Sequence, residues 1–598
     1  MELPGWSVCA IADEVSRGAC SAQTVAQEAL ARARAYDKIQ PQAWISRARD
    51  EDVLAQAERV DRRITAGELL PLAGVPVAVK DNIDVLGLET TAACPAFAYR
   101  PERSAPIIER LTAAGALIVG KTNLDQFATG LAGTRSPYGP LGCVFNREYV
   151  SGGSSSGSAV LVAAGVVPLG LGSDTAGSGR VPAAFNNLVG YKPTRGRWST
   201  RGLVPACRSL DCITTLSANA ADAARVDSVL THFDREDLFA RRTPPRIPTI
   251  GTQFRLGIPR VTELRDLAPE DAHCFAAAVA RLQAIGADPV EIDVTFFLEA
   301  ARLLYGGPWV AERTAVLEPL LERCPNAIHP VVHAIVQAGK GISAVEAFRG
   351  LYALQTHARV AEEVWDQIDV LVLPTTPTIY RISEVLAEPV ALNARLGLYT
   401  NFVNLLDMSA IAVPAGFRAS STGVGVSLIG PAWCDASLLD LAARYEETLA
   451  EPSPPRLDLE MQPARVQLGV VGAHLSGMPL HWQLSSRAAR LVQRTRTAPV
   501  YRLYAMTSQS PPKPALVHAG VDGAAIEVEV YELDVAAFGS FVNEVPPPLT
   551  IGTVTLADGS SIKGFLAEPR ATVGALDITA DGGWRAYLQR SAAVGAAS

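Results

Sequence analysis

Two turns rich in serine and glycine, residues 151–158 and 172–180, carry side chains that could do chemistry. Upstream of them a single lysine, Lys80, ends an apolar run. A serine hydroxyl can act as a nucleophile, a buried lysine without its proton is a base, and small residues leave backbone amides free to bind an oxyanion. Together these groups can break an amide bond without histidine or metal, so amide hydrolysis is our first hypothesis.

The spacing assigns different duties to the two serine turns. Ser178 follows a loop of small residues, where several backbone N–H groups can converge on one point, and it is the candidate nucleophile. Ser154 can pass a proton between Lys80 and Ser178, because a hydroxyl both donates and accepts.

Each of these residues also has an ordinary structural interpretation. A turn of glycine and serine can lack any chemistry or can bind a phosphate, although neither GxxxxGK[ST] nor a strand-borne GxGxxG is present. A lysine at the end of an apolar run is usually a surface residue whose ammonium group reaches water. The residues alone therefore leave the catalytic interpretation open.

The composition is that of a large globular protein, with 598 residues of which 48% are hydrophobic and 19% are charged. A chain of this length exceeds one hydrophobic core, so at least two domains are expected. The net charge of -8 and the lack of a basic run argue against a nucleic-acid partner.

No targeting segment or metal motif is visible. The amino terminus lacks the features of a signal peptide, and the longest apolar stretch, 159–171, is too short to span a membrane. The nine cysteines are scattered without a CxxC pair, which favours a reducing cytoplasm. The eight histidines show no metal-binding spacing, so a metal site is not expected.

The elements that must position these residues are typical of an α/β protein. A helix capped by Ser21 precedes a region in which β-prone runs alternate with helical patterns, and this alternation predicts a large sheet covered by helices. The β-prone runs are 74–79, 117–121, 254–258, 369–373 and 410–413. The later helical stretches are 270–285, 298–323 and 344–366.

A proline-rich segment marks the predicted domain boundary. Residues 1–450 form the expected catalytic domain, 451–465 a stiff linker, and 466–598 a small α+β domain. Within this last domain Asp558-Gly559 predicts a tight hairpin turn.

Three segments, 74–82, 120–127 and 152–194, resemble the amidase signature family, and the resemblance extends over roughly residues 20–450. It implies a large mixed sheet covered by helices. It also implies that Ser178 is acylated, that Lys80 is the base, and that Ser154 is the relay serine with a cis bond to Ser155. Neither a metal nor an organic cofactor is implied.

The same resemblance assigns supporting residues around the nucleophile. Ala176 is a departure, because glycine is common there in the family, but it retains its backbone N–H. The backbone donors of the implied oxyanion hole are Thr175, Ala176, Gly177 and Ser178. The residues expected to support the site are Asp174 and Arg180, as an ion pair, and Ser155.

The segment 305–313 resembles the allophanate hydrolase branch of this family. In that branch a tyrosine and an arginine at this spacing hold the substrate carboxylate, which implies this role for Tyr305 and Arg313. A guanidinium suits a carboxylate because its fork binds both oxygens. The alternative is a helix whose Arg313 faces solvent. Gly130 is a weaker candidate for a contact with the carbamoyl end.

The carboxy-terminal segments 470–480 and 545–552 resemble the small domain appended to allophanate hydrolases, which has a γ-glutamylcyclotransferase-like fold. His474 and Glu544 are candidates for assisting a decarboxylation there. A histidine in such a loop is more often a structural hydrogen-bond partner, so this role stays open.

The resemblance implies hydrolysis of allophanate to ammonia and carbon dioxide through an acyl-serine. Relatives suggest a cytoplasmic homodimer, and a biotin-dependent urea carboxylase is a partner for functional coupling; urea and cyanuric acid pathways both stay open. The alternatives are another amidase-family hydrolase and the glutamine-hydrolysing subunit of a tRNA-dependent amidotransferase. A degenerate, non-enzymatic scaffold is opposed by the joint retention of Lys80, Ser154 and Ser178.

Overall fold

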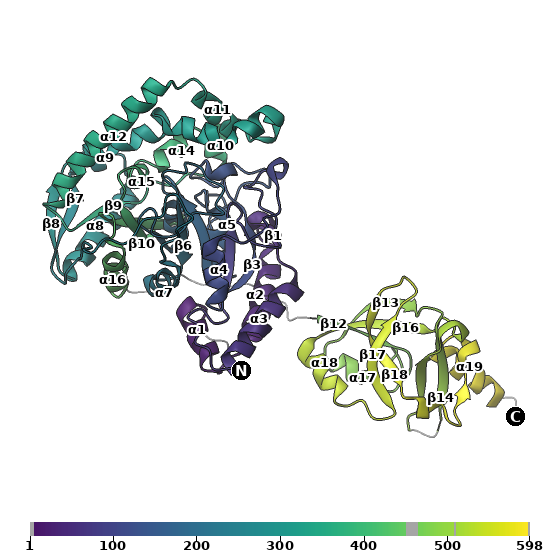
Figure 1. The fold of residues 1–598 in the computed structure, drawn as a ribbon. Helices are drawn as coiled ribbons and strands as arrows, with labels where there is room; N and C mark the ends of the chain where they lie inside the picture. Colours follow the sequence, from purple (N-terminus) through teal and green to yellow (C-terminus); the bar gives the residue numbers. More distant parts are fainter. Residues whose placement is uncertain (1–4, 450–464, 508–509, 596–598) are drawn as a thin grey trace. The chain divides into compact units, whose positions relative to one another are not determined.

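The computed structural model describes residues 5–449, 465–507 and 510–595. The chain divides into two compact units, Met1–Glu460 and Met461–Ser598 (Figure 1). The predicted linker, 451–465, lies outside the described residues except for Arg465. No helix in the described ranges is long and apolar enough to cross a membrane.

The described residues of the first unit form an 11-stranded sheet in the order β1-β3-β2-β4-β6-β5-β10-β11-β9-β7-β8. The sheet is mixed, because β2 pairs in parallel with β3 and β4, whereas β10 pairs antiparallel with β5 and β11. The prediction of a large mixed α/β sheet is thus confirmed. The strands are β1 Trp44–Arg47, β2 Pro76–Lys80, β3 Leu117–Thr122, β4 Leu169–Asp174, β5 Val189–Lys192, β6 Cys212–Ser217, β7 Phe254–Pro259, β8 Ala287–Ile292, β9 Val370–Pro374, β10 Ser409–Phe417 and β11 Gly423–Gly430.

Helices cover both faces of this sheet (Figure 1). The predicted cap is confirmed, since Ser21 Oγ accepts a hydrogen bond from Thr24 N at the start of α2. The helices are α1 Val8–Ser16, α2 Ala22–Tyr36, α3 Asp50–Thr65, α4 Pro106–Ala113, α5 Ser156–Ala163, α6 Arg180–Phe185, α7 Ala220–Leu230, α8 Pro269–Ala284, α9 Thr295–Gly306, α10 Trp309–Arg323, α11 Pro330–Gly339, α12 Ala344–Trp365, α13 Ile382–Ala387, α14 Ala391–Leu396, α15 Asn401–Leu405 and α16 Asp435–Glu446.

The alternation of side chains along β2 decides which helices meet Lys80. Val77 and Val79 pack into the core shared with α1 to α4, whereas Ala78 packs into a separate core that contains α5. Because successive side chains of a strand point to opposite faces, Lys80 lies on the α5 side. Glycine in the neighbouring strand allows α5 to approach closely, since a Cβ at Gly172 would lie 2.5 Å from Ser155 Oγ.

The predicted helical stretch 298–323 is wrong in one respect, because the structure contains two helices there. Helix α9 ends at Gly306 and α10 begins at Trp309. Gly307 is extended, with φ -127° and ψ -162°, and Pro308 has no N–H with which to continue the hydrogen-bond ladder. The break places Tyr305 and Arg313 on different helices.

The C-terminal unit is an α+β structure, as predicted. Its five-stranded sheet has the order β13-β16-β12-β18-β17, and a three-stranded sheet has the order β15-β14-β19. The hairpin at Asp558-Gly559 is confirmed, with Gly559 at φ 84° between β17 and β18. The elements are β12 Arg465–Val470, α17 Trp482–Ser485, β13 Arg490–Arg496, β14 Tyr501–Met506, β15 Lys513–His518, β16 Glu527–Asp534, α18 Val535–Val542, β17 Leu549–Thr555, β18 Ser561–Ala567, β19 Leu576–Asp577 and α19 Trp584–Gly595.

One buried carboxylate, Glu529 of β16, ties the C-terminal unit together. It accepts hydrogen bonds from Ser476 N at 2.6 Å and Ser476 Oγ at 2.7 Å, and from Arg494 and Arg585 at 3.0 Å each. Burial alone would raise its pKa, but these donors hold the pKa at about 2. Glu529 thereby fastens the loop after β12 to the sheet.

We expect Glu529→Gln to lower the free energy of unfolding of this unit by about 3 kcal/mol, because it breaks a buried, hydrogen-bonded charge network. Calorimetry of the full chain, with hydrogen exchange of β12 and β16, measures the loss. The ionised group stabilises the fold above its ordinary pKa of 4.5, and this contribution is lost as the pH falls from there towards 2. The control is Glu568→Gln, which removes an exposed ion pair with Arg570. Equal, small effects of both substitutions would contradict the role of Glu529.

Candidate active site

Lys80 is the last residue of β2, and the strand pairing decides where its side chain lies. Because β2 and β4 run in parallel, Lys80 ends beside the end of β4 and the start of α5. Its Nζ donates hydrogen bonds to three hydroxyl oxygens, of Ser154 at 2.8 Å, Ser155 at 3.0 Å and Ser173 at 2.9 Å. The lysine is fully buried, so the interpretation as a surface residue is wrong.

Burial without a salt bridge makes Lys80 a base. No ion pair of Lys80 is found within the described ranges, whereas Nζ of the buried Lys121 lies 3.0 Å from the Asp81 carboxylate. Desolvation lowers the pKa of Lys80 to about 7, because a charged amine is disfavoured in a buried site. Three carboxylates oppose this shift in pKa: Asp125, Asp174 and Asp211. A large fraction of Lys80 is therefore neutral near pH 7.

The two serines at the start of α5 differ in the freedom of their protons. Ser155 Oγ donates to Ser173 O at 3.2 Å and accepts from Lys80 Nζ, so its hydroxyl hydrogen is already used. Ser154 Oγ accepts from Lys80, and no acceptor for its own hydrogen lies among the described residues. Ser154 is thus the serine able to move a proton, and Ser155 fixes the lysine.

The cis peptide bond in this turn joins Gly153 and Ser154. The expectation of a cis bond between Ser154 and Ser155 is therefore wrong by one residue. The Ser155 N–H is used elsewhere, since it donates to Ser178 O at 3.2 Å and so joins the two serine turns. Gly153 has no side chain, and a Cβ there would collide with the Asp125 carboxylate.

Ser178 lies just after the loop that follows β4, and it is buried with 1% of its surface exposed. Its hydroxyl makes no hydrogen bond with any described residue. The structure brings Ser178 next to Ser155 through the backbone contact, but no hydrogen bond joins the Ser154 and Ser178 hydroxyls.

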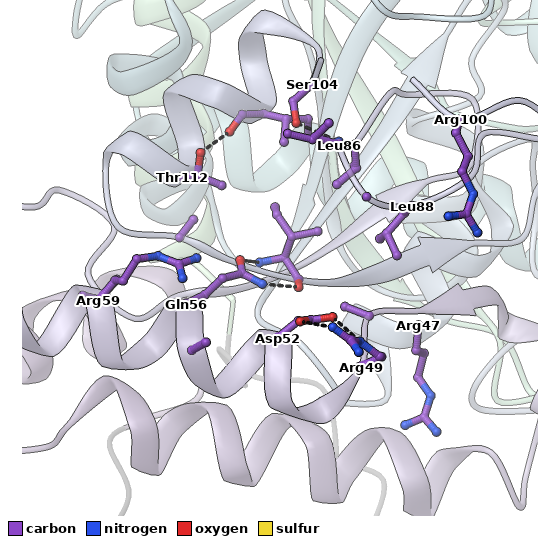
Figure 2. Close-up of a pocket in the computed structure, with 18 of the residues that line it drawn as sticks. Arg47, Arg49, Asp52, Gln56, Arg59, Leu86, Leu88, Arg100, Ser104 and Thr112 are labelled. Carbon is purple, nitrogen blue, oxygen red and sulfur yellow. Dashed lines mark hydrogen bonds and ion pairs between the residues drawn. The ribbon is translucent and has the colours of Figure 1, made fainter. Parts of the chain in front are cut away.

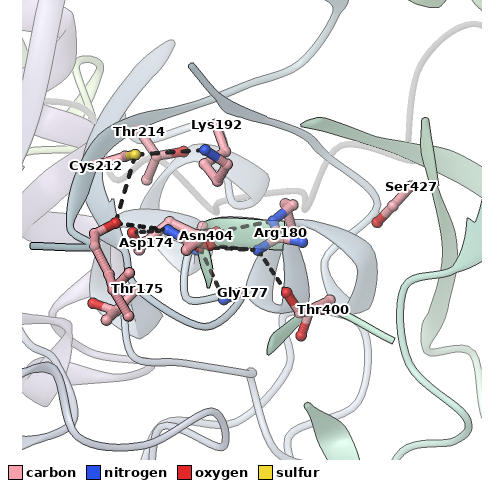
Figure 3. Close-up of polar contacts among 12 residues, drawn as sticks. Asp174, Thr175, Gly177, Arg180, Lys192, Cys212, Thr214, Thr400, Asn404 and Ser427 are labelled. Atoms are coloured by element: carbon pink, nitrogen blue, oxygen red, sulfur yellow. Dashed lines mark hydrogen bonds and ion pairs between the residues drawn. The ribbon is translucent and has the colours of Figure 1, made fainter. Parts of the chain in front are cut away.

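The carboxylate of Asp174 organises the loop that precedes Ser178 (Figure 3). It accepts from Gly177 N at 2.9 Å and from Gly179 N at 3.1 Å. The Gly177 amide is therefore already engaged, which argues against its expected place in an oxyanion hole. Among the described residues, the amides of Thr175, Ala176 and Ser178 have no acceptor, so these three are the available donors.

Arg180 supports this loop through Asp174 (Figure 3). Its guanidinium pairs with Asp174 at 3.0 Å, and both side chains are fully buried. Arg180 also donates to Thr400 O and Asn404 Oδ1, both at 3.2 Å. Gly177 packs against Thr400 with φ 125°, where a Cβ would collide with the threonine side chain. The ion pair has a supporting position.

Arg313 lies on α10, beyond the break that separates this helix from α9. Its Nη1 donates to Thr129 Oγ1 at 3.0 Å, and its guanidinium carbon lies 5.3 Å from the centre of the Tyr305 ring. The side chain is buried with 1% exposure, and its Nε and Nη2 have no partner in the described chain. The backbone of Gly130 lies against the Asp125 side chain, since a Cβ at this position would lie 2.5 Å from the Asp125 carboxylate. The solvent-facing interpretation of Arg313 is wrong.

Comparison with known families shows to which family this chain belongs. The family model described as "Amidase" matches residues 24–439. The chain belongs to the amidase family. A second model, "Allophanate hydrolase C-terminal domain", matches residues 466–589 of this amidase-family chain.

Relatives of this amidase-family chain match it over most of its length. The urea amidolyase of Saccharomyces cerevisiae is 43% identical over 572 residues, which cover 92% of this chain and 31% of that protein. This chain therefore spans about a third of the length of that relative. The allophanate hydrolase structure of Kluyveromyces lactis is 40% identical with a TM-score of 0.68, and the match covers 98% of this chain and 99% of that one. A glutamyl-tRNA(Gln) amidotransferase component from Symbiobacterium thermophilum is 36% identical over 465 residues, 72% of this chain and 94% of that protein.

The two candidate residues of the C-terminal unit are connected through a third. His474 shares a 2.7 Å hydrogen bond with Gln483, which donates to Glu544 at 3.3 Å. The His474 ring stacks on Phe565 with the ring centres 5.0 Å apart. Burial lowers the pKa of His474 to about 4, so the ring is neutral at pH 7. This environment is typical of a structural histidine.

The largest cavity described, of about 900 Å³, contains none of these residues (Figure 2). It lies beside α3 and β3, and five arginines line it: Arg47, Arg49, Arg59, Arg63 and Arg100. All except Arg59 form an ion pair with an acidic side chain. Their charges are largely neutralised, so this cavity is not an alternative active site of the amidase-family unit.

Sequence reasoning missed four residues that contact the predicted site. Ser173 accepts hydrogen bonds from Lys80 and from Asn82 Nδ2, the latter at 3.1 Å. Asp211 accepts from Thr175 Oγ1 and from Ala206 N, the latter at 2.8 Å. Arg135 is the fourth, and its contact is through Thr129. Ser173 and Asn82 lie inside the segments that resemble the family, whereas Asp211 and Arg135 had no local signal.

Proposed function

We propose that the chain hydrolyses allophanate, which is urea-1-carboxylate, to ammonia and carbon dioxide. The observation that carries the proposal is Arg313, a buried guanidinium with free N–H groups in the same unit as the lysine–serine cradle. Asp211 connects the two parts, since it accepts from Thr175 Oγ1 and interacts electrostatically with Arg313. The similarity to the allophanate hydrolase of Kluyveromyces lactis supports this substrate.

In the first half-reaction Ser178 Oγ attacks the terminal carbamoyl carbon. Neutral Lys80 accepts the proton of Ser154, and Ser154 accepts the proton of Ser178. The oxyanion is stabilised by the backbone amides of Thr175, Ala176 and Ser178. Lys80 then returns its proton through Ser154 to the leaving nitrogen, which departs as ammonia, and the N-carboxycarbamoyl group stays on Ser178.

In the second half-reaction water attacks the acyl-serine, with Ser154 and Lys80 accepting its proton. The C–O bond to Ser178 breaks, the serine recovers its proton, and N-carboxycarbamate leaves. This dicarboxylate loses carbon dioxide to give carbamate, which decomposes to ammonia and a second carbon dioxide. Neutral His474 is a weak proton donor, so we assign no step of the decarboxylation to the C-terminal unit.

The assignment of parts and partners belongs to the same proposal. Residues 1–450 form the catalytic domain and 466–598 an appended γ-glutamylcyclotransferase-like domain. We propose a cytoplasmic homodimer without metal or organic cofactor. Since allophanate is a carboxylated urea, a biotin-dependent urea carboxylase is the partner enzyme that supplies it in urea breakdown. A cyanuric acid pathway is the alternative source.

We expect Arg313→Lys to lower kcat/KM for allophanate by about 10- to 100-fold, because an ammonium group cannot bind both carboxylate oxygens through a planar fork. Biuret, in which an amide replaces the carboxylate, is the matched neutral substrate. Steady-state ammonia release measures both. Equal losses for allophanate and biuret would contradict the carboxylate clamp.

Ammonia release also separates the alternatives. Allophanate should be turned over far faster than glutamine by the wild-type chain, because glutamine carries an ammonium group beside its carboxylate. Preferred hydrolysis of glutamine would favour the amidotransferase alternative, and preferred hydrolysis of neutral amides would favour another amidase.

A further inference from the structure

Two buried guanidinium groups, of Arg135 and Arg313, donate hydrogen bonds to the same residue, Thr129. Arg135 Nη1 donates to Thr129 O at 2.9 Å, and Arg313 Nη1 donates to Thr129 Oγ1 at 3.0 Å. Arg135 is 2% exposed and Arg313 is 1% exposed. One arginine comes from the loop after β3 and the other from α10, so the fold brings two cations from distant segments to opposite sides of the same threonine.

Neither guanidinium has a counter-ion among the residues that the structure describes. Other buried arginines of the chain are paired, Arg180 with Asp174 and Arg418 with Asp271. In contrast, Arg135 Nε and two N–H groups of Arg313, at Nε and Nη2, are buried without any hydrogen-bond partner. Unpaired buried charges are costly, so this pocket is built to receive an anion.

The nearby carboxylates do not supply that anion, because other donors hold them. Asp125 accepts from Gly133 N at 2.9 Å and from the Arg135 backbone N at 2.8 Å. Asp211 is held by Thr175 Oγ1 and by backbone amides, and Glu312 by Ser209 N at 2.7 Å. These groups moderate the positive potential from a distance and leave the guanidinium N–H groups free.

We propose that Arg135 is a positioning residue for carboxylate recognition, which fixes Thr129 under Arg313 and adds a second positive charge to the pocket. The proposal rests on the proposed function, in which Arg313 binds the substrate carboxylate. Arg135 also donates to Pro389 O at 2.6 Å, so it joins Thr129 to the segment between α13 and α14. The pocket accordingly selects small amides that carry a carboxylate over neutral amides of the same shape.

The test compares Arg135→Gln and Arg135→Lys in the full chain, with allophanate and biuret as substrates. We expect Arg135→Gln to raise KM for allophanate by at least tenfold more than KM for biuret, with a much smaller change in kcat. Arg135→Lys restores the charge without the fork and should recover part of the loss. Arg59→Gln, which removes an exposed arginine of the distant cavity, is the matched control and should leave KM unchanged.

Equal increases of KM for both substrates, or no rescue by lysine, would overturn the role of Arg135 and reduce it to a structural contact. Binding of oxamate and of its neutral amide, oxamide, to the Ser178→Ala variant tests the pocket without turnover. We expect Arg135→Gln to weaken binding of oxamate at least tenfold relative to oxamide. If allophanate is not hydrolysed but oxamate binding still depends on Arg135, the proposed function fails and the anion pocket stands. If allophanate is hydrolysed and oxamate binding is unaffected, the inference fails alone.

Discussion

Replacement of Ser178 by alanine is expected to lower kcat for allophanate by about 10⁴-fold or more, because the variant lacks the atom that forms the acyl intermediate. The buried position of Ser178 and the three free amides around it make this the largest single effect in the chain. Binding should persist, since the Arg313 pocket is untouched. Single-turnover ammonia release measures the loss, and calorimetry measures the binding.

The matched control for this substitution is Ser156→Ala. Ser156 lies in the neighbouring serine turn and is buried, but its hydroxyl makes only a 3.4 Å hydrogen bond to Asn123 O. Its removal should change kcat by no more than a few fold. A Ser178→Ala enzyme that retains a tenth of wild-type turnover would overturn the assignment of the nucleophile.

Replacement of Lys80 by methionine is expected to lower kcat/KM by about 10³-fold, in the range of a lost general base. In the wild-type chain the neutral amine is the active form, and the pKa of Lys80 is about 7. Activity should therefore rise with pH through about 7 and decline below it as the lysine becomes protonated. Lys80→Met should lose this dependence, which a pH profile of kcat/KM measures.

A second buried group titrates nearby and has to be separated from Lys80. Burial raises the pKa of Asp211 to about 6, against the hydrogen bond from Thr175. In the pH profile of kcat/KM, Asp211→Asn should remove a step near pH 6 and leave the step near pH 7. If the step near pH 7 survives in Lys80→Met, then Lys80 is not the base.

Most strands and helices of the fold were predictable, because the sequence patterns that indicate them are local. The apolar runs that became β2, β3, β7, β9 and β10 and the cap at Ser21 depend on residues close together in the chain. The continuous helix expected over 298–323 is wrong, because Gly307 and Pro308 interrupt it. A proline after an extended glycine ends the helical ladder whatever the pattern around it.

The site was predictable in its residue types and much less in its contacts. Lys80 and Ser178 were candidates from their residue types and spacing, and the resemblance assigned their roles. The roles of Ser155 and of the Gly177 amide depend on which acceptors lie nearby. The hydrogen bonds from Gly177 N to Asp174 and from Thr175 Oγ1 to Asp211 follow from strand pairing and loop packing rather than from spacing. The role of Arg135 could not be predicted for the same reason. Thr129 connects it to Arg313, which lies on a helix far along the sequence.

Helix α5, which begins directly after Ser155, is buried at each of its eight positions from Ser156 to Ala163. Most helices keep one outward side on which substitutions accumulate without harm, and this one has none. The helix that follows the serine turn is consequently enclosed on every side, so a larger side chain anywhere along it has to be accommodated by its neighbours.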